Sequence, residues 1–257
     1  MSDHKPLVDW KTLHGDRFES VRVLITGAAG FIGSHLVEAL VELGAEVVAY
    51  DDLSAGRWEN LKGFDRSVEK ITASILDQKA MTEAAEGCEY LFHQAALGSV
   101  PKSLVEPVRF TDVNVRGTAC VLEAARSRKV KRLLFASSSS VYGNPPDEKP
   151  RAENEAVQPL SPYAATKAAG EQLLRAWSES YGLDAVSLRY FNVFGPRQNA
   201  DSDYAAVIAA FGKAMAAGRV GTIYGDGEQA RDFTYVANVV HGNLLAAACN
   251  RGLGGQV

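Results

Sequence analysis

Short apolar runs alternate with longer amphipathic stretches along most of this chain. The run "VRVLIT" at residues 21–26 is almost entirely apolar, as a strand buried on both faces requires. Glycines follow it, and then "FIGSHLVEALVELG", which is apolar at helical spacing and ends at Gly44. Further strand-like runs are "EVVAYDD", "SVEKITA", "YLFHQAA", "RLLFASS" and "DAVSLRYF", and helix-like runs lie near residues 78–86, 106–129 and 161–181. This alternation predicts an α/β fold, a doubly wound parallel sheet with helices on both faces.

The pattern changes after Asn192. The stretch "NVFGPRQNADSDYAAV" is polar and rich in loop-forming residues. A helix to about Ala217, a short strand "GTIYGDG" and a helix from about Val236 to Cys249 follow it. The chain ends in "GLGGQV", which has the pattern of the start of another strand. We therefore expect a smaller C-terminal substrate-binding lobe that is truncated.

These patterns divide the chain into three parts. Residues 1–20 form an N-terminal extension, and residues 21–191 form a nucleotide-binding domain with the reactive groups. Residues 192–257 form a partial substrate lobe whose elements are interleaved with that domain. The extension lacks the apolar core of a signal peptide. A short helix with Leu7, Trp10 and Leu13 on one side would lie against the domain. A leader without fixed structure is the alternative.

Composition and charge exclude several classes of protein. A hydrophobic share of 46% and a charged share of 23% are ordinary for a soluble globular protein. A net charge of −4 gives no electrostatic case for binding nucleic acid or an anionic membrane, and no apolar run approaches the roughly 20 residues that span a bilayer. Cys88, Cys120 and Cys249 lie far apart without metal-ligand spacing, so we expect no metal site and a reducing, cytoplasmic location.

Three glycines follow the first predicted strand. Gly27, Gly30 and Gly33 form G-x-x-G-x-x-G in "TGAAGFIGSHL", between a strand and a helix. The first permits a tight turn, the second lets the backbone approach a pyrophosphate, and the third allows close helix packing. The phosphates then sit at the positive helix N-terminus. A tight turn into any helix can use such glycines, but their position after the first buried strand favours a Rossmann-type dinucleotide site.

An acidic residue at the end of the second predicted strand bears on the choice of cofactor. Asp51 lies 18 residues after Gly33, where a carboxylate can accept both ribose hydroxyls of an adenosine and would repel a 2′-phosphate. This favours NAD over NADP. Two alternatives stay open, since Asp51 could cap a loop and Arg57 nearby would suit NADP.

A tyrosine and a lysine stand four residues apart at the start of the helix predicted from "PLSPYAATKAAGEQLL". At this spacing Tyr163 and Lys167 share one helix face. Taken alone, the pair is best interpreted as a surface tyrosine beside a solvated lysine. Its meaning therefore depends on the motifs around it.

Those motifs resemble one known family. They are the glycine motif, "HQAALGSVPKS", "NVRGT", "ASSSSVYG", "SPYAATK", "LRYFNVFGPRQ" and "GDGEQARDF". From residue 21 to its end the chain is similar to the extended short-chain dehydrogenases/reductases, and among them to nucleotide-sugar 4-epimerases, in particular UDP-N-acetylglucosamine 4-epimerases. The resemblance implies a tightly held NAD and a UDP-sugar substrate, either the UDP-GlcNAc/UDP-GalNAc pair or also UDP-Glc/UDP-Gal. It also implies a homodimer formed through two helices of each subunit, here roughly residues 104–128 and 161–181.

The resemblance also assigns the reactive groups. Tyr163 is the proton-transfer residue, and Lys167 places a cation near its phenolate. Because a free phenol has a pKa of about 10, this cation and the positive nicotinamide ring should lower the pKa of Tyr163. Ser138 hydrogen-bonds the reacting oxygen, and Asn114 supports the same network. The implied cycle takes a proton and a hydride from the sugar 4-position, turns the 4-keto sugar over, and returns the hydride to its other face.

Two sets of binding residues follow from the resemblance. The cofactor is expected against Gly27, Gly30, Phe31, Ile32, Gly33, Asp51, Ser74, Ile75, Ala95, Asn114, Tyr163, Lys167 and Tyr190. The sugar nucleotide is expected against Gly98, Ser99, Ser138, Ser139, Asn192, Gln198, Ala206 and Arg231. For Arg231 the alternative is a salt bridge to Asp232 or another acid, and we expect Lys102 and Arg197 to be solvated.

Departures from related enzymes narrow the reaction. Sugar-nucleotide 4,6-dehydratases carry an Asp-Glu pair directly after the reactive serine, and related decarboxylases carry a Glu. This chain has Ser139 and Ser140, which cannot do carboxylate work. Ser74-Ile75 stands where relatives often hold the adenine amino group with an acid. Dehydration or decarboxylation is thus the disfavoured alternative, and a non-catalytic NAD-binding protein is disfavoured by the intact reactive residues.

Overall fold

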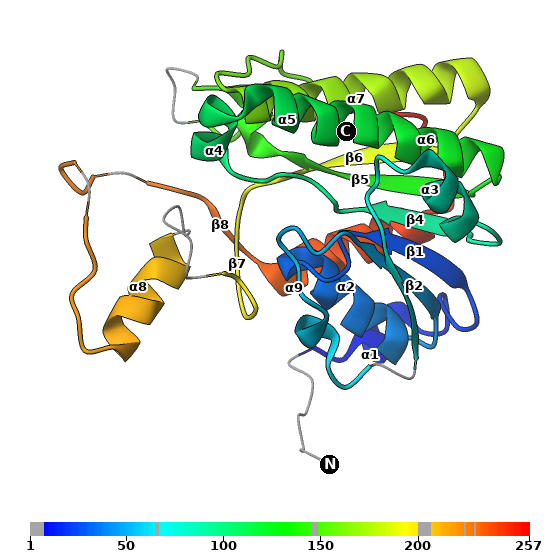
Figure 1. Cartoon of the computed structure of the whole chain (residues 1–257), viewed down its shortest axis with the longest axis horizontal. Coiled ribbons are helices and arrows are strands. Elements are labelled where there is room, and N and C mark those ends of the chain that lie inside the picture. The colour runs from blue at the N-terminus through cyan, green and yellow to red at the C-terminus, as the bar shows by residue number, and fades with distance from the viewer. Residues whose placement is uncertain (1–7, 65–66, 145–148, 200–206, 224, 229) are drawn as a thin grey trace.

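The computed structural model describes residues 8–64, 67–144, 149–199, 207–223, 225–228 and 230–257. Within them, six parallel strands form a central sheet in the order β3-β2-β1-β4-β5-β6 (Figure 1). From β1, the chain first adds strands on one side of the sheet and then, with β4, on the other side. The strands are β1 Arg22–Thr26, β2 Glu46–Asp51, β3 Val68–Thr72, β4 Tyr90–His93, β5 Arg132–Ser138 and β6 Ala185–Tyr190. The predicted doubly wound parallel sheet is confirmed.

Helices cover both faces of this sheet. The helices α1, α2 and α9 lie on one face, and α3, α6 and α7 lie on the other (Figure 1). Their bounds, with those of α4, α5 and α8, are α1 Trp10–His14, α2 Phe31–Glu42, α3 Gln78–Ala84, α4 Val100–Val105, α5 Pro107–Thr111, α6 Gly117–Ser127, α7 Pro162–Tyr181, α8 Val207–Ala216 and α9 Val236–Ala248. A π-helical turn, Asp112–Arg116, joins α5 to α6, so the helix expected over residues 106–129 is three segments in place of one.

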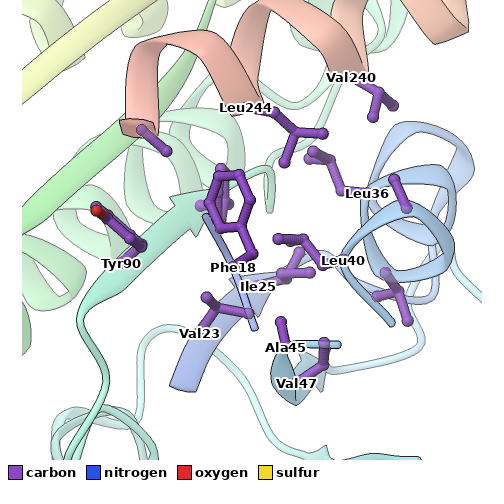
Figure 2. Packing of buried hydrophobic residues seen from close by; sticks show 14 of the residues in the cluster. Phe18, Val23, Ile25, Leu36, Leu40, Ala45, Val47, Tyr90, Val240 and Leu244 are labelled. Carbon is purple, nitrogen blue, oxygen red and sulfur yellow. The ribbon is translucent and has the colours of Figure 1, made fainter. Parts of the chain in front are cut away.

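Alternation along each strand divides the core in two. Val23 and Ile25 join the cluster beneath α2 and α9, whereas Leu24 joins the cluster beneath α3, α6 and α7, because successive strand side chains point to opposite faces. Figure 2 shows the first cluster, in which Phe18 lies among side chains of β1, α2 and α9. Phe18 is fully buried, and burial of such a side chain contributes about 1.5–3 kcal/mol. It therefore fixes the N-terminal extension to the domain.

The described part of the N-terminal extension is helical and packed. Asp9 caps α1 by accepting a hydrogen bond from the Thr12 N–H at 3.0 Å. Trp10 is buried as expected, but Leu13 is 49% exposed and His14 occupies the buried position in its place. Consecutive helical residues point in different directions, so the inward face of this short helix runs through Trp10 and His14. Leu7 lies outside the described residues.

The C-terminal region differs from the prediction in one strand. Residues 221–223 are irregular, and Gly225 and Gly227 adopt positive φ in a turn, a conformation that ends strands. The strand of this region is β8 Phe233–Tyr235, which pairs in parallel with β7 Asn192–Phe194. The C-terminal stretch that was expected to begin another strand forms one isolated bridge, between Gln256 and Val186.

The last two helices lie in different surroundings. The helix predicted from about Val236 is α9, and it packs against α2, so it completes one face of the main sheet. α8 has no buried residue and stands away from the sheet in Figure 1. The region after residue 192 therefore contributes both to the Rossmann-type core and to a separate arm.

Candidate active site

A large pocket of about 830 Å³ opens at the carboxyl ends of the strands. Its walls come from the loops after β1, β2, β3 and β4, from the end of β5, and from the start of α7. Ligands of doubly wound sheets bind at this edge, beside the point where the strand order reverses. The pocket is in the size range of small-molecule sites, about 300–1,000 Å³.

The glycine motif forms the pocket floor between β1 and α2. Gly27 has φ of 69°, and a Cβ there would lie 2.7 Å from the Ala95 nitrogen. A Cβ on Gly33 would lie 2.1 Å from the Gly27 oxygen, so only glycine fits at either place. No side chain caps the N-terminus of α2, which begins after Gly30. Its free amides and positive dipole end fit the pyrophosphate of a dinucleotide.

Asp51 is oriented at the pocket wall by the backbone. Its Oδ2 accepts the Ala29 N–H at 2.9 Å and its Oδ1 accepts the Leu53 N–H at 2.8 Å. Burial raises the pKa of the Asp51 carboxyl, against the effect of these two bonds. Each oxygen keeps a lone pair for a ribose hydroxyl. Gly56, which the sequence analysis did not single out, leaves this space open, since a Cβ on it would lie 2.9 Å from Oδ2.

Tyr163 and Lys167 both line the pocket, on the first turns of α7. The Lys167 Nζ donates to the Ala136 carbonyl at 2.7 Å and lies 6.0 Å from the centre of the Tyr163 ring. Burial lowers the pKa of Lys167 to about 8. The surface interpretation of this pair is therefore wrong.

Burial and hydrogen bonding act on the pKa of Tyr163 in opposite directions. Burial raises it above its ordinary value, while a hydrogen bond with Ser138 acts the other way. With the protein's own groups alone, Tyr163 is therefore a neutral phenol, and the lowering of its pKa that we expect from Lys167 together with a nicotinamide ring stays a prediction.

Ser138 ends β5 beside this pair. Its Oγ accepts hydrogen bonds from the Ser140 N–H at 3.2 Å and the Ser140 hydroxyl at 2.9 Å, which leaves its own proton free to donate towards Tyr163. Ser140 thus holds Ser138 in place. The neighbouring Ser139 does not line the pocket.

Tyr190 is held at the far wall by two amides that sequence reasoning missed. Asn243 of α9 donates to the Tyr190 hydroxyl at 2.7 Å, and that hydroxyl donates to the Gln94 Oε1 at 3.2 Å. Burial raises the pKa of Tyr190 to about 12, so it remains a neutral phenol. The position of Gln94 directly after β4 could have identified it as a pocket residue. No sequence pattern marked Asn243, because the sequence analysis assigned α9 to the other lobe.

The structure brings most of the predicted site residues together. The predicted residues that line the pocket are Gly27, Gly30, Phe31, Ile32, Gly33, Asp51, Ile75, Ala95, Gly98, Ser138, Tyr163, Lys167, Tyr190 and Gln198. Those that lie elsewhere are Ser74, Ser99, Asn114, Ser139, Asn192 and Arg231. Ala206 lies outside the described residues.

The residues that lie elsewhere have local partners. Ser99 caps α4, and the Ser74 Oγ accepts the Leu76 N–H. Asn192 donates to the Asp232 carbonyl at 3.3 Å. The guanidinium of Arg231 is exposed and donates to the carbonyl of Ala230, and its expected phosphate contact stays a prediction.

Lys102 is exposed, as expected. Arg197 was also expected to be solvated, but it is not. Its guanidinium binds Glu38 and His35 of α2 and donates to the Asn60 carbonyl at 3.1 Å. Arg197 also lines the pocket. It therefore ties the loop after β7 to the helix that follows the glycine motif.

Acidic groups are sparse in this pocket. Among its described lining residues, the carboxylates are Asp51, the last residue of β2, and Asp52, which follows it. Two strands separate β2 from β5, which carries Ser138. In the part of the chain that the structure describes, no group of three or more His, Cys, Asp or Glu residues could hold a metal ion, and no helix is long and apolar enough to cross a membrane.

Known proteins resemble this chain over most of its length. Residues 23–256 match the NAD dependent epimerase/dehydratase family. A UDP-glucose 4-epimerase of Mycolicibacterium smegmatis is 45% identical over 224 residues, which are 86% of this chain and 71% of that protein.

Solved structures extend the comparison to the fold. A UDP-N-acetylglucosamine 4-epimerase from Methanobrevibacter ruminantium, in complex with UDP-N-acetylmuramic acid, superposes with a TM-score of 0.87 at 43% identity, over 91% of this chain and 75% of that one. A dTDP-glucose 4,6-dehydratase from Streptomyces venezuelae, with NAD bound, gives a TM-score of 0.84 at 32% identity, over 91% and 74%. With the family match covering nearly all of its residues, the chain belongs to the NAD dependent epimerase/dehydratase family.

Proposed function

We propose that this protein is an NAD-dependent UDP-sugar 4-epimerase that interconverts UDP-GlcNAc and UDP-GalNAc and also accepts UDP-Glc and UDP-Gal. The observation that carries the proposal is the convergence of Ser138, Tyr163 and Lys167 in the pocket of the glycine motif, where the carboxylates among the described lining residues are those of Asp51 and Asp52, on the far side of the sheet edge. The similarity to UDP-glucose and UDP-N-acetylglucosamine 4-epimerases supports it.

The residues present fit the cofactor. The uncapped α2 N-terminus suits the pyrophosphate, and the Asp51 carboxylate suits the adenosine ribose and disfavours a 2′-phosphate. Arg57 also lines the pocket, but as an exposed side chain, whereas the Asp51 carboxylate is buried and held in place by two backbone amides. We therefore assign NAD. When bound, NAD⁺ supplies the hydride acceptor and donor for carbon 4 of the sugar.

The chain's own residues handle the proton and the geometry. Tyr163 removes the proton of the sugar 4-hydroxyl and later returns it, and Ser138 donates a hydrogen bond to the same oxygen. Lys167, mostly protonated below its pKa of about 8, stabilises the phenolate that forms. Lys167 is buried and Tyr163 is partly buried, which shields both groups from water and strengthens these interactions.

Dehydration is the alternative reaction, since a 4,6-dehydratase is among the similar structures. Eliminating water needs an additional acid and base. The described pocket residues near Ser138 offer none, because Ser139 does not line the pocket and Ser140 is hydrogen-bonded to Ser138. Epimerisation needs only the groups that are present.

Proton NMR of the sugar anomeric region tests the proposal. Purified protein is incubated with UDP-GlcNAc or with UDP-Glc, without added NAD, and the 4-epimer should appear in each case. The Tyr163→Phe variant should lose about 10²–10⁴-fold in turnover while keeping bound NAD, because general acid–base groups contribute that much. Tyr181→Phe, at the exposed end of the same helix, is the matched control and should be unaffected. A 4-keto-6-deoxy product, or full activity of Tyr163→Phe, would contradict the proposal.

We further propose a homodimer in the cytoplasm. α4 and α5 expose Leu104, Val105 and Val108, the last at 81%, beside an apolar groove of about 520 Å³ that continues to Leu173 of α7. A second copy would cover this surface through the same helices. Val108→Glu should shift the protein to monomers in sedimentation experiments without unfolding it, and an unchanged sedimentation coefficient would refute this interface. The three free cysteines suit a reducing compartment.

A further inference from the structure

A buried histidine outside the reactive set stands between the cofactor side and the catalytic helix. His93 ends β4, is 1% exposed, and is the register partner of Thr26 on β1. Its Nδ1 lies 2.8 Å from the Thr26 Oγ1, and its Nε2 lies 3.0 Å from the Thr118 Oγ1 of α6. The ring packs against Phe135 with centroids 5.6 Å apart. Every polar atom of this imidazole therefore has a partner.

The direction of these hydrogen bonds is fixed by the atoms at the two ends. The Thr118 hydroxyl donates to the Asn114 carbonyl at 2.6 Å, so it can only accept from His93, whose Nε2 must carry the proton. The His93 Nδ1 then accepts from the Thr26 hydroxyl, and the Thr26 Oγ1 accepts the Ala95 N–H at 3.3 Å. The chain of donors runs one way, from Ala95 to Asn114.

The series of hydrogen bonds continues from Asn114 to the catalytic tyrosine. The Asn114 side chain clamps Leu97, accepting its N–H at 2.8 Å and donating to its carbonyl at 3.1 Å. It also donates to the Thr166 Oγ1 at 3.0 Å, and Thr166 donates to the Tyr163 carbonyl at 2.7 Å. The π-helical turn around Asn114 is the kind of local irregularity often found at functional sites.

Both ends of this series of hydrogen bonds face the pocket. Ala95 and Leu97 line it on the side of the glycine motif, and Tyr163 lines it on the side of the reacting group. We propose that His93 is a positioning residue, whose neutral, Nε2-protonated imidazole sets the distance between the loop after β4 and the start of α7, and so places Tyr163 against the cofactor. This inference rests on the proposed function for its kinetic consequence, but not for its structural one.

A role for His93 as a proton donor or acceptor in the reaction does not fit. It does not line the pocket, and its two nitrogens are occupied. Burial, together with the nearby charge of Lys167, lowers the pKa of His93 to about 3, so the ring stays neutral at any physiological pH. If His93 only filled the core, its loss would lower stability and leave kcat unchanged. The experiment must therefore separate an effect on stability from an effect on the position of Tyr163.

The test compares variants that keep or remove each link. His93→Leu removes both links, whereas His93→Gln can still donate to Thr118. His93→Leu should lower kcat about 10–100-fold with little change in KM, as expected when positioning residues are lost, and His93→Gln should recover much of it. Thr118→Val should have a similar effect, and adding it to His93→Leu should cost little more, because the residues act as one unit. Val48→Ala changes a core residue of the same sheet that takes no part in these hydrogen bonds. This control variant should be less stable and retain kcat.

A second readout does not depend on activity. Nitrogen-15 NMR of the histidine ring should show His93 as the Nε2–H tautomer without titration across neutral pH, and Thr118→Val should change its shifts. A titrating ring, or the Nδ1–H tautomer, would overturn the proposed direction. Full kcat in both folded His93→Leu and Thr118→Val would overturn the positioning role. If the wild type turns over no UDP-sugar, the proposed function fails, and the NMR result still decides the structural inference.

Discussion

Replacing Lys167 with Met tests how the burial of this ammonium shapes the protein. Its pKa is lowered by burial from 10.5 to about 8. Between these values the unfolded chain holds a proton that the folded protein has released, so the free energy of unfolding rises with pH there. The lowered pKa corresponds to about 3 kcal/mol, which the folded protein loses in full below pH 8 and regains above 10.5. Lys167→Met removes this cost, although it also removes the bond to the Ala136 carbonyl.

The difference in free energy of unfolding between Lys167→Met and the wild type should therefore fall by about 3 kcal/mol from below pH 8 to above pH 10.5. Urea titrations at several pH values measure it, on cofactor-free protein, because bound ligand would stabilise the two proteins unequally. Changes in packing caused by the substitution do not depend on pH and cancel in this comparison. Lys79→Met, at a side chain 86% exposed, is the control and should show no such change. A difference that does not vary with pH would refute the reasoning.

Two further predictions concern the nucleotide site. Gly33→Ala places a Cβ 2.1 Å from the Gly27 oxygen, so α2 must shift and NAD affinity in fluorescence titrations should fall at least about tenfold. Gly242→Ala, on α9 with nothing near the added atom, is the control, and equal affinities in the two variants would contradict the close-approach argument. Asp51→Asn removes the charge that repels a 2′-phosphate, which is worth about 1–4 kcal/mol at ~4 Å, so the preference for NAD over NADP should narrow about tenfold or more. An unchanged ratio of the two affinities would show that Asp51 does not set the choice.

The sequence predicted the sheet and its nucleotide edge well, for a clear physical reason. Strands buried on both faces must be almost wholly apolar, so runs such as "RLLFASS" stand out without any knowledge of their neighbours. The glycine motif and Asp51 depend on local backbone geometry next to such strands, and both line the pocket. The spacing of Tyr163 and Lys167 likewise needs only one helix to form.

Predictions that depended on contacts between distant segments were less successful. Ser99 caps α4, and Asn192 begins β7 and donates to the Asp232 carbonyl beside it, so both side chains bind backbone atoms in preference to the pocket. Arg197 was assigned to solvent because its partners, His35 and Glu38, lie far away on α2. His93 was hidden in an apolar run, and only the pairing of β1 with β4 brings it beside Thr26. Tertiary register decides such contacts, and no local pattern reports it.

The same helix that carries the reactive pair also carries a buried acid one turn further on. Glu171 follows Lys167 by four residues, so a direct ion pair would be the simplest way to satisfy both charges. The structure instead pairs Glu171 with Arg189 of β6 through two hydrogen bonds of 2.8 and 2.9 Å, and Ser137 donates to the same carboxylate. Arg189 in turn lies over the Tyr142 ring at 4.6 Å.

This arrangement leaves the Lys167 ammonium with a neutral carbonyl as its hydrogen-bond partner. A carboxylate beside it would raise its pKa and draw the charge away from the pocket, so that less of it would act on the Tyr163 phenolate. Because Arg189 neutralises Glu171 within the core, the positive charge of Lys167 remains available where the reaction needs it. The buried Arg189–Glu171 pair thus serves the site by keeping an acid out of it, which stability alone would not require.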